Sequence, residues 1–241
     1  MTHVAFSGFP RIGAKRELKR ALEQHWRGEI DADALRKAAR DLRARHWRLA
    51  RDAGADSVPV NDFSLYDHVL DTAVLFDAIP DRYRPLCGRD PLAGYFAMAR
   101  GAHSGGVDVH ALEMTKWFDT NYHYIVPELD AHQRFALRGS KPIDEFREAR
   151  ALGHDARPVI LGPVSFLRLA KSTDGSAPLA LLDALLPAYA DLLARLAEAG
   201  AEWVQLDEPC LATDLDAAAQ DALRRAYTTL AKGRAPKLLL A

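Results

Sequence analysis

The chain has 241 residues, of which 49% are hydrophobic and 27% charged, a composition typical of a globular protein with one large domain. The formal net charge is -1 and the isoelectric point is near 6.8, so neither a nucleic acid nor a membrane is expected as a partner. The first residues lack the basic start and apolar block of a signal peptide, and no apolar run approaches the roughly 20 residues that cross a bilayer. We therefore expect a cytoplasmic location.

The cysteines and histidines show no metal-binding spacing. Cys87 and Cys210 are the two cysteines, and their distance in the sequence argues against a disulfide framework or a cysteine-rich zinc site. The nine histidines include no HxH or HExxH pattern. We expect no metal site within this chain.

Apolar periodicity predicts strands and helices in alternation. The apolar run Val4–Phe9 predicts a buried strand, and strong helix formers follow from Lys15. Residues 157–167 are apolar on both faces apart from a break at Gly162-Pro163, as in a strand of a parallel sheet. Helices are also expected at residues 31–53, 92–100, 141–153, 179–199 and 216–232, and strands from residue 57, at 203–206 and at 237–241. Residues 77–110 are expected to form a long excursion, with 101–106 mobile.

This order of elements predicts an α/β fold with a parallel sheet and right-handed crossovers. We count about six strands, whereas a closed (β/α)8 TIM barrel needs eight over roughly 250 residues. The expected fold for residues 1–241 is therefore an incomplete barrel of this type, with about six strands.

Polar residues follow two of the predicted strands. After the strand that begins at residue 57 come Asn61, Asp62, Tyr66, Asp67 and His68, where a parallel sheet carries its site. For His68 alone, a hydrogen-bonded cap of the next helix is the simpler interpretation.

The second such strand, at 203–206, runs directly into Asp207 and Glu208. Two carboxylates at that edge would orient a substrate or pair with an arginine from a loop. The structural alternative is that they cap the turn before Pro209.

Two basic residues near the first predicted helix form a candidate anion site. Arg16 and Lys19 are three residues apart, so they share a helix face, and the partial positive charge of the helix N-terminus adds to theirs. The alternative is an ordinary solvated face, which is what most basic runs on helices are.

The stretch from Glu113 to Glu128 mixes aromatic and polar residues without a period of 2 or 3.6. Such mixtures line ligand pockets, which have mostly apolar walls with a few placed polar groups. The simpler alternative is a core strand followed by an aromatic loop, with Lys116 in solvent. Around Lys116 the stretch contains Trp117, Phe118, Asp119, Asn121, Tyr122, His123 and Tyr124.

Six motifs give the chain a close resemblance to one family. They are Gly8-Phe-Pro-Arg-Ile-Gly, Arg16-Glu-Leu-Lys, Asp62-Phe-Ser-Leu-Tyr-Asp-His, Glu113-Met-Thr-Lys-Trp-Phe-Asp-Thr-Asn-Tyr-His-Tyr, Leu161-Gly-Pro-Val and Gln205-Leu-Asp-Glu-Pro. In this order they resemble the N-terminal part of cobalamin-independent methionine synthase, the 5-methyltetrahydropteroyltriglutamate:homocysteine methyltransferase. The resemblance covers nearly the whole chain.

The resemblance implies two (β/α)8 barrels that face each other across a cleft. The methyl group of 5-methyltetrahydropteroyltri-L-glutamate passes to L-homocysteine at the C-terminal barrel, giving L-methionine. There a zinc ion held by His, Cys, Glu and Cys binds the homocysteine sulfur as a thiolate, its nucleophilic form. The N-terminal barrel helps to hold the folate and its polyglutamate tail.

The resemblance also implies particular site residues in this chain. The folate-contacting segment of the family falls on Arg16, Glu17, Leu18 and Lys19, and a further folate contact falls on Lys116. Cations suit a tail of linked carboxylates. Candidates for lining the cleft are Trp117, Asn121, His123, Asp207 and Glu208.

Measured against the family, the chain is expected to end within the sixth strand of the first barrel. The C-terminal catalytic barrel, the zinc ligands and the homocysteine site would then lie outside it, and the chain alone would be inactive. It would be a fragment, a truncated gene product or one part of a split enzyme. Two alternative functions remain: a non-catalytic folate-binding or partner-binding module, and an independent barrel enzyme that uses Asp207, Glu208 and His123.

Overall fold

The computed structural model describes residues 3–103, 106–233 and 235–241. Part of the segment expected to be mobile, residues 104 and 105, lies outside the described residues. The α-helices are α1 (Glu17–Trp26), α2 (Ala32–Asp52), α3 (His68–Leu75), α4 (Arg84–Arg89), α5 (Pro91–Arg100), α6 (Lys141–Ala151), α7 (Pro163–Leu169), α8 (Leu182–Glu198) and α9 (Ala217–Leu230). Short 3-10 helices are η1 (Asp81–Tyr83), η2 (Pro178–Leu181) and η3 (Pro209–Ala212).

The strands of the described residues form three sheets. The largest is parallel and has four strands in the order β1-β5-β7-β8, namely β1 (Val58–Val60), β5 (Ala156–Leu161), β7 (Trp203–Asp207) and β8 (Lys237–Leu240). An antiparallel hairpin pairs β2 (Met114–Lys116) with β3 (His123–Ile125), and β4 (Glu128–Leu129) pairs with β6 (Lys171–Ser172) in parallel. The predicted α/β class is confirmed. The four-stranded parallel sheet does not close into a barrel, and the expected count of about six barrel strands is not confirmed.

The first apolar run is not a regular strand. Between Val4 and Phe9 the chain makes a single parallel bridge, from Ala5 to Ser57 beside β1. Within β1, Val58 donates its backbone N–H to the β5 side, so the next residue, Pro59, faces the first segment. Pro59 has no N–H, and its carbonyl accepts a hydrogen bond from the indole of Trp47 at 2.9 Å. Backbone pairing therefore cannot extend along this edge.

The predicted strand at residues 157–167 is two elements. β5 ends at Leu161, and α7 begins at Pro163, with Gly162 as the residue before the helix. Proline favours the first turn of a helix because it needs no N–H there. The Gly-Pro break is therefore a helix start: the strand expected before it is confirmed as β5, and the expectation that a strand continues to residue 167 was wrong.

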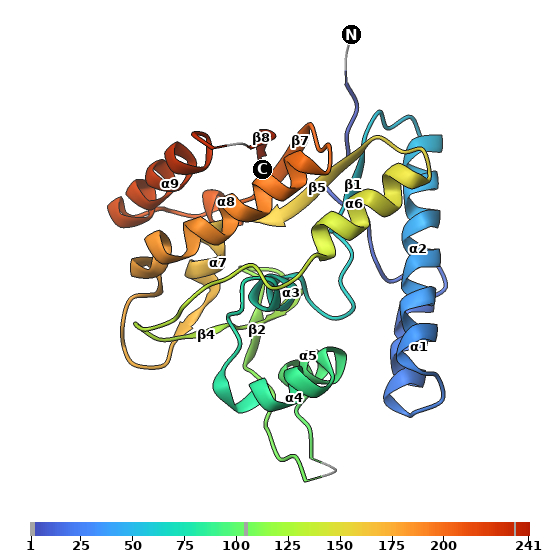
Figure 1. The fold of residues 1–241 in the computed structure, drawn as a ribbon, viewed down its shortest axis with the longest axis horizontal. Coiled ribbons are helices and arrows are strands. Elements are labelled where there is room, and N and C mark those ends of the chain that lie inside the picture. The colour runs from blue at the N-terminus through green and yellow to red at the C-terminus, as the bar shows by residue number, and fades with distance from the viewer. Residues whose placement is uncertain (1–2, 104–105, 234) are drawn as a thin grey trace.

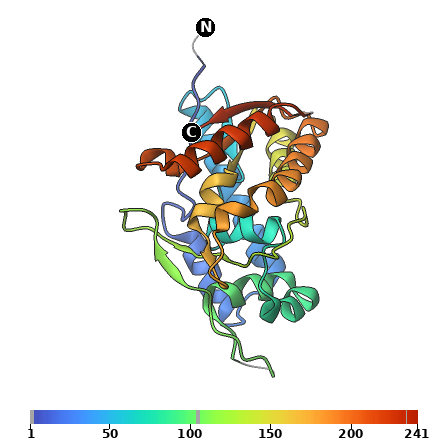
Figure 2. The ribbon, with the colours of Figure 1, turned by 90° about the vertical axis from the view of Figure 1, so that its left-hand side faces the viewer.

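Two hydrophobic clusters hold the molecule together. One packs the parallel sheet against α6, α7 and α8, and the other packs α1 and α2 against α3 and α5. In Figure 1, α1 and α2 lie on the right of the molecule and α8 and α9 on the left, with the sheet between them near the top. Figure 2 shows the segment that contains the β2–β3 hairpin projecting from one side. No helix of the described residues is long and apolar enough to cross a membrane.

Candidate functional site

A cavity of about 220 Å³ lies where the parallel strands end. Three of the sheet's segments deliver residues to it: Asn61 and Asp62 follow β1, Leu161 ends β5, and Asp207 ends β7. The carboxyl ends of parallel strands are where α/β folds carry their sites. The full lining is Ser7, Gly8, Phe9, Asn61, Asp62, His68, Asp71, Thr72, Leu75, Lys141, Pro142, Val159, Leu161 and Asp207.

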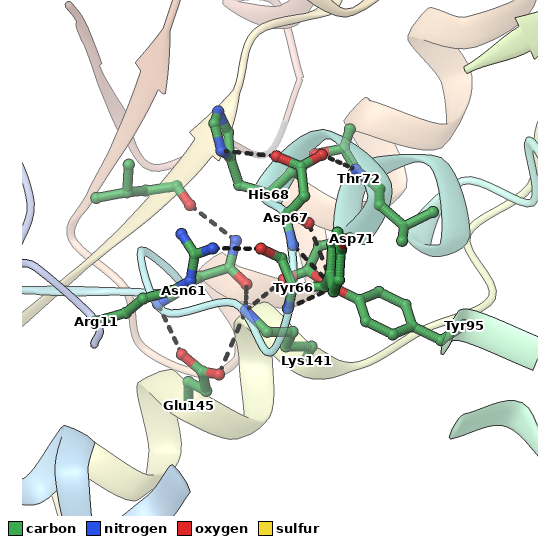
Figure 3. Close-up of polar contacts among 12 residues, drawn as sticks. Arg11, Asn61, Tyr66, Asp67, His68, Asp71, Thr72, Tyr95, Lys141 and Glu145 are labelled. Carbon is green, nitrogen blue, oxygen red and sulfur yellow. Dashed lines mark hydrogen bonds and ion pairs between the residues drawn. The ribbon is translucent and has the colours of Figure 1, made fainter. Parts of the chain in front are cut away.

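Asn61 fixes one wall of the cavity. Its φ of 66° lies in the left-handed region that favours glycine. Three contacts hold it there: its backbone N–H donates to Glu145 at 3.0 Å, its side-chain amide donates to the Val159 carbonyl at 2.8 Å, and its side-chain oxygen accepts from Lys141 at 2.8 Å. Figure 3 shows these contacts converging between β1 and α6. Strained backbone of this kind clusters at functional sites.

Lys141 is neutralised by its neighbours. Its Nζ lies 3.3 Å from a carboxylate oxygen of Asp71 and 3.3 Å from one of Glu145, besides the bond to Asn61. Burial alone would lower the pKa of Lys141, but the two carboxylates outweigh it and raise the pKa. The ammonium group therefore stays charged and already faces three acceptors.

Two other acids of the cavity have no such cation. Asp62 accepts the backbone N–H of Phe9 at 2.7 Å, and burial raises the pKa of its carboxyl to about 6. Asp207 accepts the amide of Gln205 at 2.6 Å, and burial raises its pKa as well. Within residues 3–103, 106–233 and 235–241, no Lys, Arg or His nitrogen lies within 4.0 Å of either carboxylate. More distant charges, Lys141 for Asp62 and His68 and Arg157 for Asp207, favour the ionised forms, but burial outweighs them.

Asp67, next to His68 of the cavity wall, joins the hairpin to the start of α3. Its side chain is 1% exposed and accepts the backbone N–H groups of Leu70 at 3.0 Å and Ile125 at 3.1 Å. The hydroxyl of Tyr122 donates to the same carboxylate at 3.1 Å. Asp67 thereby caps α3 and anchors β3 at once.

The cap of α3 is therefore Asp67, and His68 is the first residue of the helix. The His68 ring lies in the cavity wall and packs against Trp117 with ring centroids 4.7 Å apart. Burial lowers the pKa of His68, which favours the neutral imidazole at neutral pH.

The residues expected to contact folate lie outside this cavity. Arg16, exposed at a φ of 59°, immediately precedes α1, and Lys19 pairs with Glu23 at 3.5 Å. Glu17 pairs with Arg45 at 2.8 Å. Leu18 is 1% exposed, so it packs beneath this segment and offers a ligand almost no surface.

Lys116 is exposed at the end of β2, where it pairs across the hairpin with His123. No contact among the residues described joins it to Arg16 or Lys19. The structure thus presents two separate basic positions, one on α1 and one on the hairpin.

The candidates for the cleft divide into three groups. Trp117 is half-buried among aromatic rings in the turn of the hairpin, whereas Asn121 in the same turn and His123 at the start of β3 are exposed. Asp207 lines the cavity. Glu208 is fully buried and turns away from it.

Glu208 instead caps α7. It accepts the backbone N–H groups of Val164 at 3.1 Å and Ser165 at 2.6 Å, and the hydroxyl of Tyr227 at 2.9 Å. The two adjacent acids therefore do not act as a pair: Asp207 faces the cavity and Glu208 stabilises a helix start. The arrangement of Asp207, Glu208 and His123 considered from the sequence does not form.

Three residues of the site carried no recognisable sequence signal. Lys141 was interpreted only as a helix start, and Asp71 and Glu145 lie within helices. The spacing of Lys141 and Glu145, four apart on one helix, predicts an ion pair but does not say that it faces a cavity. Among the residues described, no group of three or more His, Cys, Asp or Glu side chains is arranged to hold a metal ion.

Sequence comparison identifies relatives along the whole chain. A family described as "Cobalamin-independent synthase, N-terminal domain" matches residues 3–241. The 5-methyltetrahydropteroyltriglutamate–homocysteine methyltransferase of Xylella fastidiosa is 69% identical over 240 residues, which are 100% of this chain and 32% of that protein. The Caulobacter vibrioides protein of the same name is 58% identical over 94% of this chain and 31% of its own length. The chain spans about a third of the length of these relatives.

Solved structures share the fold. A putative vitamin-B12-independent methionine synthase from Listeria monocytogenes aligns with a TM-score of 0.63 and 15% identity, over 100% of this chain and 65% of that one. A B12-independent methionine synthase from a Shewanella species, in complex with selenomethionine, aligns with a TM-score of 0.59 and 13% identity. This alignment covers 88% of this chain and 53% of that one. At such identities the likeness concerns the fold alone. Because the family match spans residues 3–241, this chain belongs to the cobalamin-independent methionine synthase family, as its N-terminal domain.

Proposed function

We propose that this chain supplies the folate-binding part of a methyltransferase that moves the methyl group of 5-methyltetrahydropteroyltri-L-glutamate to L-homocysteine. The observation that carries the proposal is the 69% identity to a 5-methyltetrahydropteroyltriglutamate–homocysteine methyltransferase over the whole chain. Since only a third of that relative is matched, the contribution we assign to this chain is binding of the folate tail, without turnover of its own.

The tail-binding residues we propose are Arg16, Glu17, Leu18, Lys19 and Lys116. Arg16 and Lys116 are exposed, and in the part of the chain that the structure describes no carboxylate lies within 4.0 Å of either. Free cations of this kind suit the linked carboxylates of a polyglutamate. Glu17 binds Arg45 and so steadies the start of α1, and Leu18 packs beneath it. Trp117, Asn121 and His123 would extend the surface along the hairpin.

We assign homocysteine and the zinc ion of the family to the remainder of the protein, because the side chains described here form no metal-binding group. When bound, zinc keeps the homocysteine sulfur deprotonated at neutral pH. The barrel type and the cytoplasmic location inferred from the sequence also remain proposals. A non-catalytic folate-binding or partner-binding module is the alternative proposal. It predicts that adding the rest of the enzyme as a separate chain restores no turnover.

The test is calorimetric titration of the purified chain with 5-methyltetrahydrofolate triglutamate and with the monoglutamate. We expect the triglutamate to bind about tenfold more tightly, because each added carboxylate gains charge-assisted hydrogen bonds. Lys116→Ala and Arg16→Ala should each reduce this preference. Lys232→Ala, which removes an exposed lysine at the end of α9, is the matched control and should leave it unchanged. Equal affinity for the two folates would contradict the proposal.

A further inference from the structure

We propose that the cavity at the carboxyl ends of β1, β5 and β7 is a second binding site, which takes the primary ammonium group of a small organic molecule. The inference does not depend on folate binding, because none of the proposed tail residues lines the cavity. It rests on three features of the wall: two acids without an ion pair, a lysine that is already engaged, and five apolar residues.

The acids supply more acceptors than the protein uses. Asp62 and Asp207 each receive one hydrogen bond through one carboxylate oxygen, from Phe9 and from Gln205 respectively. No cationic nitrogen among the described residues reaches either carboxylate within 4.0 Å. A primary ammonium group carries three donors and a positive charge, which matches what these two acids lack.

Lys141 does not meet this demand. Its ammonium group is held by Asn61, Asp71 and Glu145. Oδ2 of Asp71 is buried and faces this ammonium group at 3.3 Å, so the carboxylate of Asp71 is already compensated by Lys141.

The rest of the wall selects an organic cation. Five lining residues are apolar, which suits a short hydrocarbon body, and the described residues include no group of three or more His, Cys, Asp or Glu side chains arranged to hold a metal ion. The volume of about 220 Å³ lies below the roughly 300–1,000 Å³ of pockets for drug-sized ligands, so the cavity suits a molecule smaller than a whole folate. The apolar residues are Phe9, Leu75, Pro142, Val159 and Leu161.

The probe is 1-propylammonium chloride, titrated into the isotopically labelled chain at constant ionic strength and followed by amide chemical shifts. The comparison ligands are 1-propanol, of similar shape without charge, and propionate, of opposite charge. We expect saturable shifts at residues of the cavity wall and an affinity about tenfold or more above that of 1-propanol, because the charged donor meets unpaired carboxylates. Equal affinities, or shifts that saturate outside the cavity, would overturn the inference, as would the same shifts with potassium chloride alone.

Variants test the assignment of the acids. Asp62→Asn and Asp207→Asn keep the shape of each side chain and an acceptor for its present partner, and each should weaken propylammonium binding about tenfold. Asp214→Asn removes an exposed carboxylate outside the cavity and should leave the affinity unchanged. Circular dichroism identifies any variant that fails to fold. Unaltered affinity in folded Asp62→Asn and Asp207→Asn would refute the site.

Discussion

The two ends of the parallel sheet treat their charges in opposite ways. At the amino end, Arg157 is 5% exposed and donates to Gln205 at 3.1 Å, to Ser57 at 2.9 Å and to the carbonyl of Phe6. At the carboxyl end, Asp62 and Asp207 are both largely buried, and no Lys, Arg or His nitrogen of the described residues lies within 4.0 Å of either carboxylate, although Gln205 links Asp207 to Arg157. The charge at the first end is fully hydrogen-bonded, whereas the acids at the second end have no direct ion pair.

This difference indicates a division of labour within one sheet. A buried charge that is fully hydrogen-bonded fixes neighbouring segments, and here the guanidinium ties the first segment to β1, β5 and β7. A buried charge that is not compensated lowers stability and persists where a ligand or a reaction uses it. In α/β barrels the same ends divide in this way, with stability at the amino ends of the strands and sites at the carboxyl ends.

The largest effect is expected from Arg157→Met. The change leaves the buried partners Gln205 and Ser57 without a donor, so the free energy of unfolding should fall by about 3 kcal/mol. Urea denaturation measures it. The matched control is Arg195→Met, which removes an exposed arginine paired with Asp191 and should cost about 0.5 kcal/mol or less. A loss below about 1 kcal/mol for Arg157→Met would mean that the amino end is not the stabilising one.

The next largest effect is expected from Asp62→Asn, which should raise the free energy of unfolding instead of lowering it. The pKa of Asp62 is raised to about 6 in the folded chain, chiefly by burial, from an ordinary value of 3.8. The folded state therefore binds more protons than the unfolded state between these values, and stability falls as the pH rises through this window. Asp62→Asn should be more stable than the unchanged chain by about 2 kcal/mol at pH 8.

Below about pH 4 the carboxyl is protonated in both states, and the advantage of Asp62→Asn should vanish. Thermal or urea unfolding of both proteins from pH 3 to pH 8 gives the profile, with Asp214→Asn as the exposed control. A stability difference that does not change with pH would show that the carboxyl end bears no uncompensated charge.

The sequence predicted which end of the sheet carries the polar residues but not how they pair. Asn61, Asp62 and His68 follow a buried strand, and the structure places all three in the cavity wall, as strand direction requires. Asp207 and Glu208 are adjacent and chemically alike, yet one faces the cavity and the other caps α7. That choice depends on where the N-terminus of α7 lies in space, which local pattern does not encode.

Long-range contacts explain the other differences as well. The run Val4–Phe9 has strand composition, but the proline in β1 removes the partner that would pair with it. The helices at residues 31–53 and 179–199 are predicted closely because an amphipathic period is a local property, and they appear as α2 and α8. Lys141 was missed as a site residue because its partners come from β1 and α3.

The smallest effect is expected at Asp67, a buried acid at the carboxyl end that does have its donors. Tyr122→Phe removes the hydroxyl that donates to Asp67 and accepts from Arg11 at 3.3 Å, while the backbone donors Leu70 and Ile125 remain. The free energy of unfolding should fall by about 1 kcal/mol. Hydrogen exchange should quicken at Ile125 more than in β5, because the loss is confined to the anchor of the hairpin. A uniform increase in exchange rate across the chain would mean that Asp67 supports the whole fold, as Arg157 does. The contrast between the two ends of the sheet would then apply only to the acids that line the cavity.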